Sequence, residues 1–264
     1  MPSILTQETD PRVKELRSRL DSFYTSTSEY RAFKKVNSKP EYWGPVNDRV
    51  RTILDRKSSC SVLEFGAGIT GYKNSLEEMR ARVRFVVQDV TDQNEAQLKE
   101  LADEVVIGDV ADIDETFDVI FSTFVFEHVT TPRATLEHLL GRLNPGGSLF
   151  IACPRYGIPF YTPPSARHYG FLRRLGIFLR LAQFRLKSFF SGKPAFLIHI
   201  DPSVFHGPWF RDSDAVHWPS YGDLKRALPK GYRLGRVRNK AASGFKGWIY
   251  RRFLLLSVEI RRDG

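Results

Sequence analysis

Short apolar runs alternate with amphipathic stretches through the middle of this chain. Five runs have the length and residue types of buried β-strands, at 61–65, 83–87, 104–107, 118–121 and 148–152. Between them, apolar residues recur at helical spacing in 75–82, 95–102 and 132–143. Because a strand, a helix and a parallel strand form the repeating unit of α/β folds, this alternation predicts an α/β chain. We expect a mostly parallel sheet with helices on both faces.

The flanking segments predict further elements. Asp10-Pro11 is typical of a helix start, and a second helix is expected over 46–54. An insertion rich in aromatic and basic residues follows the fifth strand. After it come a helix at 221–228 and two strands, 232–237 and 253–260, that we expect to pair antiparallel. We predict a single domain with N-terminal helices in 1–57, a ligand-binding core in 58–154, an insertion or lid in 155–218, and closing elements in 219–264.

The composition bears on the compartment. The chain carries two cysteines, Cys60 and Cys153, beside apolar runs, so we expect buried free thiols and a reducing, cytoplasmic environment. Residues 1–10 lack the basic region and apolar core of a secretory signal. No run of about 18 uncharged apolar residues is present, so no membrane-spanning helix is predicted.

A glycine turn follows the first predicted strand. Gly66 and Gly68 let the backbone bend sharply and approach a ligand closely, and Glu64 places a carboxylate just before the turn. Asp89 and Asp109 follow the next two strands. Because ligands of open α/β sheets bind beyond the carboxyl ends of the strands, we expect these acids to surround one ligand. An acid about 20 residues after such a turn is typical of ribose binding, and a further carboxylate can accept a hydrogen bond from an adenine amine.

Five segments occur in a fixed order along the chain: LEFGAG at 63–68, Asp89, Gly108-Asp109, FDVIFSTFVFEHV at 117–129 and LNPGGSLFIACP at 143–154. Together they resemble the class I S-adenosylmethionine-dependent methyltransferases, in the group with Glu-His after the fourth strand. The resemblance implies a Rossmann-like sheet of seven strands, with S-adenosyl-L-methionine over the glycine turn, its ribose at Asp89 and its adenine at Asp109. The cofactor-binding residues that it implies are Glu64, Gly66, Ala67, Gly68, Asp89, Val90, Asp109, Val110 and Thr123.

One departure from this family leaves a second enzyme class open. Thr70 stands where the family often has a third glycine. Gly66, Gly68 and Gly71 instead match G-x-G-x-x-G, which is typical of nicotinamide-dependent oxidoreductases. An NAD(P)-dependent oxidoreductase is therefore the alternative, although Glu64, the Asp109 segment and the Asn-Pro-Gly-Gly turn favour the methyltransferase.

A second departure concerns metal binding. Related O-methyltransferases of ubiquinone biosynthesis can bind a divalent cation through E-x-x-E-H, but here Phe124 replaces the first glutamate before Glu127-His128. Two ligands rarely form a site, so we predict no metal and a structural or substrate-orienting role for this pair. His128 is the candidate general base toward a substrate hydroxyl.

The insertion is the most basic part of a chain whose net charge is +10. Between positions 155 and 200 it has eight basic residues and no acidic residue. At about 100° per residue, Phe171–Phe190 places phenylalanine and leucine side chains on one helix face and Arg173, Arg180 and Lys187 opposite. Such a helix is typical of peripheral contact with a membrane surface, and the alternative is a lid that packs on the core.

Histidines and aromatic residues are also frequent in the insertion, among them His168, His199, His206, His217, Trp209 and Trp218. Their spacing matches no metal motif, and they suit a pocket for a sugar or small ring, with Asp212–Trp218 as a pocket or support segment.

The leading function is O-methylation of a small molecule, a sugar or a lipid-linked glycan by direct in-line transfer, in the cytoplasm or at the inner membrane surface. The substrate partner is then a small molecule or a glycan. A non-catalytic membrane- or RNA-associated protein that retains the fold is a further alternative. Nucleic acid is not an expected partner, since no RNA-binding motif accompanies the basic residues.

Overall fold

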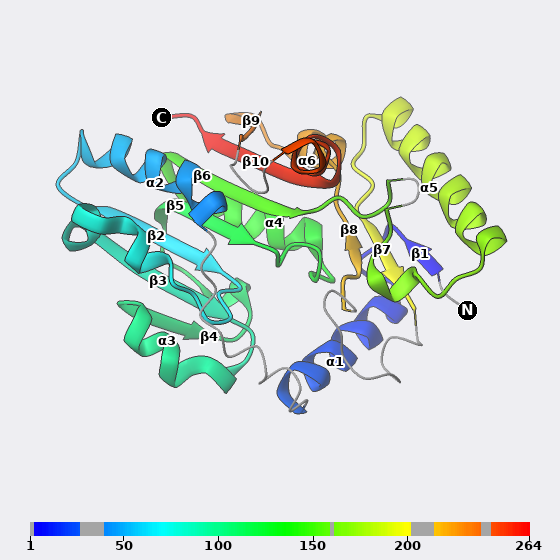
Figure 1. The fold of residues 1–264 in the computed structure, drawn as a ribbon, viewed down its shortest axis with the longest axis horizontal. Coiled ribbons are helices and arrows are strands. Elements are labelled where there is room, and N and C mark those ends of the chain that lie inside the picture. Colours follow the sequence, from blue (N-terminus) through cyan, green and yellow to red (C-terminus); the bar gives the residue numbers. More distant parts are fainter. Residues whose placement is uncertain (1–2, 27–39, 159–160, 202–213, 239–243) are drawn as a thin grey trace.

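The computed structural model describes residues 3–26, 40–158, 161–201, 214–238 and 244–264. Its main sheet has seven strands, in the spatial order β4 (Glu104–Ile107), β3 (Val83–Asp89), β2 (Cys60–Phe65), β5 (Phe117–Thr123), β6 (Leu143–Pro154), β10 (Leu255–Arg262) and β9 (Tyr232–Arg236) (Figure 1). The strands from β4 to β6 pair parallel, and β10 runs antiparallel to both β6 and β9. The α/β prediction, with a mostly parallel seven-stranded sheet and a closing antiparallel pair, is confirmed.

Helices cover both faces of this sheet. One face packs against α2 (Pro40–Leu54), the 3₁₀ helix η2 (Tyr72–Arg82) and α3 (Glu95–Leu101). The other face packs against α4 (Pro132–Gly141) and α6 (Tyr221–Ala227). The remaining connections include the short 3₁₀ turns η3 (Asp92–Asn94), η4 (Val110–Asp112) and η5 (Pro164–Ala166), the helix α7 (Gly244–Ile249) and the π-helical turn η7 (Tyr250–Leu254).

The two-residue period of the strands separates the two cores. Val62 of β2 lies in a cluster with Val50 of α2 and Leu76 of η2. Its neighbour Leu63 lies in the other cluster, with Leu136 of α4. Successive side chains of a strand point to opposite faces, so a sheet that is buried on both faces needs the continuous apolar runs from which its strands were predicted.

Two elements differ from the sequence prediction. The segment expected to be an α-helix at 75–82 is 3₁₀-helical and kinked at Glu77, whose φ is 48°. Its buried residues Leu76 and Met79 lie on either side of this kink, so one regular helix does not carry both. The expected turn at 144–147 lies within β6, where it forms a bulge: the register with β5 jumps from Phe117↔Leu143 to Val119↔Ser148.

A second, three-stranded sheet was not predicted. It has the order β1 (Ser3–Leu5), β7 (Leu197–Ile200) and β8 (His217–Trp218), all antiparallel. The helix α1 (Pro11–Ser26) packs on one of its faces, where Leu20 meets Ile198, and α5 (Phe171–Ser191) packs on the other, where Leu181 meets Leu197. Two segments far apart in the sequence thus fold together.

The small sheet and α5 lie beyond the carboxyl ends of β2, β5 and β6 (Figure 1). The described part of the insertion therefore stands at the sheet edge where a ligand was expected. No helix among the described residues is long and apolar enough to cross a membrane.

Candidate active site

A cavity of about 480 Å³ lies at the carboxyl ends of β2, β3, β4 and β5. Residues 64–69, 88–90, 108–110 and 123–125 form its walls, and Leu20 and Tyr24 of α1 line it as well. All the residues assigned from the sequence to the cofactor or to catalysis line this one cavity: Glu64, Gly66, Ala67, Gly68, Asp89, Val90, Asp109, Val110, Thr123 and His128.

The glycine turn is held by hydrogen bonds to β3. The backbone N–H groups of Gly66 and Ala67 donate to Gln88 O at 2.9 and 3.0 Å, and Gly68 N donates to Asp89 Oδ2 at 2.6 Å. Gly66 and Gly68 have φ angles of 70° and 59°. A side chain is costly in this left-handed region, so the turn needs glycine at both positions.

Gly71, the third glycine of the G-x-G-x-x-G match, has no comparable role. Its φ is −107°, an ordinary value for any residue, and it does not line the cavity. The neighbouring Thr70 is buried and its Oγ1 accepts a hydrogen bond from Tyr72 N at 3.1 Å. The segment after Gly68 therefore forms a local turn, and Gly71 does not take the part of the third glycine in a dinucleotide-binding loop.

Two of the strand-end acids are nearly inaccessible. Glu64 and Asp89 are 5% and 3% exposed. Burial raises the pKa of Asp89, and the N–H groups of Gly68 and Thr91, which donate to its two oxygens, partly oppose this rise. A carboxylate that is desolvated and already oriented can accept further hydrogen bonds from a ligand at little additional cost.

The third acid, Asp109, is paired. Its carboxylate accepts from Ala111 N at 2.9 Å and forms an ion pair with Arg17 of α1. Burial alone would raise the pKa of Asp109, but the Ala111 amide and the Arg17 guanidinium together lower it. This carboxyl group therefore stays ionised, and α1 supplies a cation at the end of the cavity.

His128 lies beside two carboxylates. Its Nδ1 is 3.3 Å from Asp214 Oδ2, and its Nε2 is 3.9 Å from Glu127 Oε1. Tyr24 of α1 donates its hydroxyl proton to Asp214 Oδ2 at 2.7 Å. A carboxylate beside one ring nitrogen favours the tautomer that carries its proton on that nitrogen, which leaves the other nitrogen able to take a proton.

Glu127, the residue before His128, connects the His128 loop to β8. Glu127 is fully buried, and its backbone carbonyl accepts from Val216 N at 2.9 Å and His217 N at 2.8 Å. His217 Nδ1 lies 2.9 Å from Phe126 O. The β8 segment is therefore fastened to the loop that carries His128. Among the described residues, no three His, Cys, Asp or Glu side chains are placed to hold a metal ion.

Phe124, which replaces the first glutamate of the metal motif, directly follows β5 and has an unusual backbone conformation. Its φ is 60°, and its N–H donates to Ala152 O at 2.7 Å. Positive φ is uncommon outside glycine, and such residues concentrate at functional sites. Phe124 lines the cavity and packs edge-on against Tyr42 of α2, with ring centroids 5.0 Å apart.

Three described members of the aromatic and histidine set of the insertion, His199, His217 and Trp218, are buried in the core and do not line the cavity. His199 and His217 are buried, and burial lowers their pKa values to about 4 and about 3, so both are neutral. Trp218 stacks on His199 with centroids 4.7 Å apart. Of the segment Asp212–Trp218, only the part from Asp214 onward is described, and of that part Asp214 lines the cavity. His206 and Trp209 lie outside the described residues.

Sequence reasoning missed the part of the cavity that α1 builds. Arg17, Asp21 and Tyr24 line it, but only the start of this helix, at Asp10-Pro11, was predicted from the sequence. Nothing in the sequence joins Tyr24 to Asp214, since the two are 190 positions apart. A signal was present for Asp214 alone, as part of the segment that was expected to form or support a pocket.

Comparisons with known proteins agree with this geometry. Residues 30–192 match a family model described as a methyltransferase domain. The chain is similar in structure to the plantazolicin methyltransferase BpumL in complex with a triazolic desmethylPZN analog and SAH, with 13% identity, a TM-score of 0.53, and 96% of this chain and 99% of that chain covered. It is similar as well to the plantazolicin methyltransferase BamL in a complex of the same kind, with 13% identity, a TM-score of 0.52, and 97% and 99% covered. None of the curated proteins matches the chain in sequence.

Proposed function

The chain belongs to the S-adenosylmethionine-dependent methyltransferases, and we propose that it methylates a hydroxyl oxygen of a small molecule, a sugar or a lipid-linked glycan. The proposal rests on one observation: His128, held beside Asp214, lines the same cavity as the strand-end acids. The family match decides against the nicotinamide-dependent oxidoreductase, and the absence of Gly71 from the cavity lining agrees with that decision.

We assign the cofactor to the part of the cavity over Gly66–Gly68. When bound, S-adenosylmethionine supplies a methyl group that its sulfonium makes electrophilic. The glycine turn leaves backbone open to close approach, and Glu64 accepts a hydrogen bond from the amino group of the ligand. Asp89 accepts from the ribose hydroxyls, and Asp109 from the adenine amine. The assignment is supported by the convergence of these groups on a cavity whose volume suits a small-molecule ligand.

The remaining cofactor contacts are assigned to the walls of the same cavity. Ala67 lies between the two glycines, Val90 and Val110 follow Asp89 and Asp109, and Thr123 ends β5. Because Arg17 pairs with Asp109, we expect its guanidinium to move aside or to share the carboxylate when adenine enters. The helix α1 then covers the ligand and helps exclude water from it.

We assign the proton transfer to His128. With Asp214 Oδ2 3.3 Å from Nδ1 favouring the tautomer protonated there, its Nε2 takes the proton of the acceptor hydroxyl. The Glu127 carboxylate, 3.9 Å from Nε2, stabilises the imidazolium that results. Tyr24 keeps Asp214 oriented through its 2.7 Å hydrogen bond. General-base assistance of this kind contributes about 10²- to 10⁴-fold in rate, and alignment of the reacting atoms supplies the rest.

We also propose a compartment and a substrate class for this methyltransferase. Both cysteines are buried free thiols, as predicted, which suits a reducing cytoplasm. We propose a small molecule or a glycan as the acceptor.

The test separates binding from chemistry. Calorimetry measures the affinity for S-adenosylhomocysteine, and labelled S-adenosylmethionine measures transfer to hydroxyl-bearing glycans and phenols and to matched amines. We expect His128→Asn to keep the affinity within about twofold and to lower kcat for the hydroxyl acceptors by about 100-fold or more.

The matched control is His168→Asn, since His168 is half-exposed and does not line the cavity. Its kcat should equal that of the unmodified protein. Transfer to amines in preference to hydroxyls, or full activity of His128→Asn, would overturn the choice of acceptor and base. Failure to bind S-adenosylhomocysteine would overturn the cofactor assignment itself.

A further inference from the structure

The helix α5 turns its most apolar side away from the protein. Phe171, Leu172, Phe189 and Phe190 are 70%, 81%, 67% and 81% exposed. Leu175, Leu179 and Leu186 on the same side are exposed as well. The lid alternative required this side to pack on the core, and that part of the sequence interpretation is wrong. Exposed apolar surface of this kind, contiguous along a helix, marks a contact with something outside the fold.

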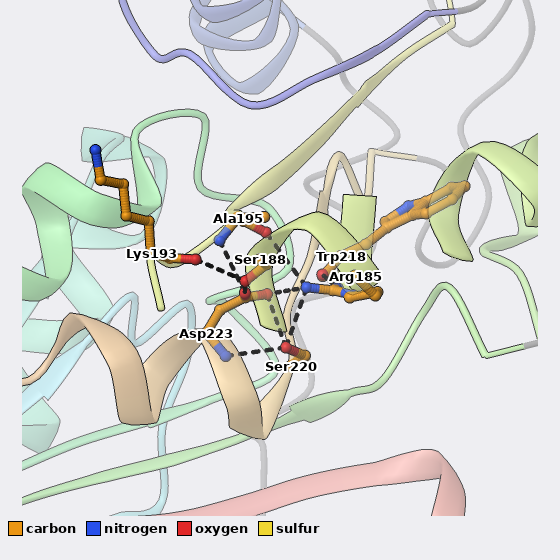
Figure 2. A network of polar contacts seen from close by, with 7 residues as sticks. All are labelled: Arg185, Ser188, Lys193, Ala195, Trp218, Ser220 and Asp223. Atoms are coloured by element: carbon orange, nitrogen blue, oxygen red, sulfur yellow. Dashed lines mark hydrogen bonds and ion pairs between the residues drawn. The ribbon is translucent and has the colours of Figure 1, made fainter. Parts of the chain in front are cut away.

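A polar network holds α5 in this orientation (Figure 2). Arg185 forms an ion pair with Asp223 of α6 and donates to Trp218 O at 2.8 Å and Ser220 Oγ at 3.1 Å. Ser188 donates to Lys193 O at 2.7 Å. Asp223 is fully buried. Because Arg185 must face this buried carboxylate, the helix cannot rotate to bring its exposed phenylalanines and leucines inward without breaking the pair.

A smaller apolar group completes the packed side. Leu181 is buried in the core of the small sheet, with Ile177 and Phe184 partly buried against it. The apolar residues of α5 that face the protein therefore lie on a different side of the helix from the one that its sequence pattern singled out.

The third side of α5 is basic. Arg173, Arg180 and Lys187 are exposed and border the apolar side. Within the described part of the chain, no carboxylate forms an ion pair with any of the three. Between 155 and 200 there are eight basic residues and no acidic residue, and one of the eight, Arg185, pairs with Asp223 outside this range.

We propose that α5 docks the enzyme on the surface of an anionic lipid bilayer, with its phenylalanines and leucines in the headgroup–acyl boundary and its basic side at the lipid phosphates. An exposed apolar face beside a row of cations is the pattern of helices that lie in a membrane interface. Each cation near an anionic surface adds to the attraction. The docking does not depend on the identity of the methyl acceptor.

Charge argues against the two other occupants of this face. A second copy of the chain would bring an identical cluster of cations against the first, with no acid between residues 155 and 200 to pair with them. A nucleic acid would satisfy the cations but would leave leucines and phenylalanines without an apolar partner. Lipid is the partner that satisfies both sides of α5.

The experiment measures partition of the full chain into vesicles by sedimentation. The vesicles contain phosphatidylcholine alone or with about 30% phosphatidylglycerol. The anionic lipid attracts basic residues near the surface, so their contribution to binding becomes measurable. One variant removes apolar contacts: Leu172→Gln, Leu179→Gln, Leu186→Gln and Phe190→Gln. A second variant reverses the charges: Arg173→Glu, Arg180→Glu and Lys187→Glu. We expect binding of the unmodified protein to anionic vesicles, and at least about tenfold weaker partition for each variant.

A third variant controls for net charge with Arg51→Glu, Arg56→Glu and Lys230→Glu. It has the same charge as the second variant, but α2, which carries Arg51, lies at the opposite end of the molecule from α5 (Figure 1). Its partition should stay within about threefold of the unmodified protein. Retained affinity for S-adenosylhomocysteine shows that each variant is folded.

Three outcomes overturn the proposal. The first is equal partition of the apolar variant and the unmodified protein. The second is equal binding to neutral and anionic vesicles. The third is self-association that is lost in the apolar variant, measured by sedimentation velocity, together with no vesicle binding. That last result would make this side of α5 an interface between two copies of the chain.

Discussion

A single side chain, Val125, determines how much room the glycine turn has. A Cβ built on Gly66 would lie 2.4 Å from Val125 Cγ1, and the φ of Gly66 is +70°. Both the contact and the backbone conformation therefore exclude any other residue at this position. The turn must also remain open to the cavity, because Gly66 and Val125 both line it.

We predict that Gly66→Ala loses cofactor affinity. The methyl group forces either Val125 or the turn to move, and the left-handed conformation costs a further 1–2 kcal/mol, roughly, for a residue with a Cβ. Titration with S-adenosylhomocysteine should show at least about tenfold weaker binding. Gly192→Ala is the control, since Gly192 has a φ of +67°, nothing within 4 Å of the added Cβ, and a place outside the cavity. Equal loss in both variants would show that backbone strain alone, and not the contact with Val125, causes the effect.

At the residue scale, the sequence was sufficient for side chains placed by strand periodicity. Glu64 is the second-last residue of β2, Asp89 ends β3 and Asp109 lies two residues after β4, and the edge that parallel strands share brings them together. Tyr24 and Asp214 could not be found in this way. Their proximity depends on how α1 packs across the small sheet, which is a property of tertiary contacts between distant segments.

At the scale of one element, the orientation of α5 depends on Arg185. Burial lowers the pKa of this guanidinium to about 10, yet it stays charged at neutral pH opposite the Asp223 carboxylate. The Asp223 carboxylate also accepts a hydrogen bond from Ala195 N at 2.9 Å. Asp223 belongs to the first turn of α6, and Ser220 is the N-cap of that helix. One carboxylate thus joins α5, α6 and the segment before β7.

We predict that Arg185→Leu loosens α5. The change leaves Asp223 buried and without its cation, and the loss of one partner of a buried pair costs about 3–5 kcal/mol. For a chain of this size the melting temperature should fall by about 10 °C. Amide exchange in α5 should rise at the same time. Arg180→Leu, on the exposed side of the same helix, should change stability by less than about 0.5 kcal/mol. A melting temperature unchanged by Arg185→Leu would contradict the anchoring role.

The sequence predicted where helices and strands lie better than it predicted which side of each element packs against the protein. The bounds of α5 follow from periodicity, but the direction of its apolar side follows from an ion pair that spans 38 positions. The strands β1 and β8 have three and two residues, which is too short for an alternating pattern to register. In η2, the apolar spacing predicted a helix, but it did not predict the kink at Glu77 that separates Leu76 from Met79.

At the scale of the whole molecule, α1 connects the two sheets. Its Val13, Leu16 and Leu20 pack on the small sheet, and its Arg17 and Tyr24 reach the cavity of the large one. The N-terminal strand β1 completes the sheet on which α1 rests. The geometry of the candidate active site is therefore coupled to the insertion, and a change in how the small sheet packs would reach His128 through Tyr24 and Asp214.

The reactivity of the two buried thiols measures whether the whole protein is folded. Burial raises the pKa of Cys60 to about 12, with the Asp118 carboxylate adding to the rise, and burial raises that of Cys153 as well. Neither thiol is exposed enough to meet a reagent: Cys60 is 2% and Cys153 0% exposed. We predict that a thiol reagent at about pH 8 modifies both cysteines only as fast as the protein unfolds, since the thiolate is the reactive form.

The same shift makes stability depend on alkaline pH. An acid whose pKa is higher in the folded state holds its proton there while the unfolded chain releases it, so stability is complete below the unfolded value, 9.0 for Cys60, and falls as the pH rises toward the folded value of about 12. The free energy of unfolding, from urea titrations at about pH 8 and about pH 10, should decrease, and Cys60→Ala should reduce the decrease. Lysines and tyrosines also titrate in this range, and the variant isolates the thiol from them. An equal decrease in both proteins would mean that Cys60 already loses its proton in the folded state.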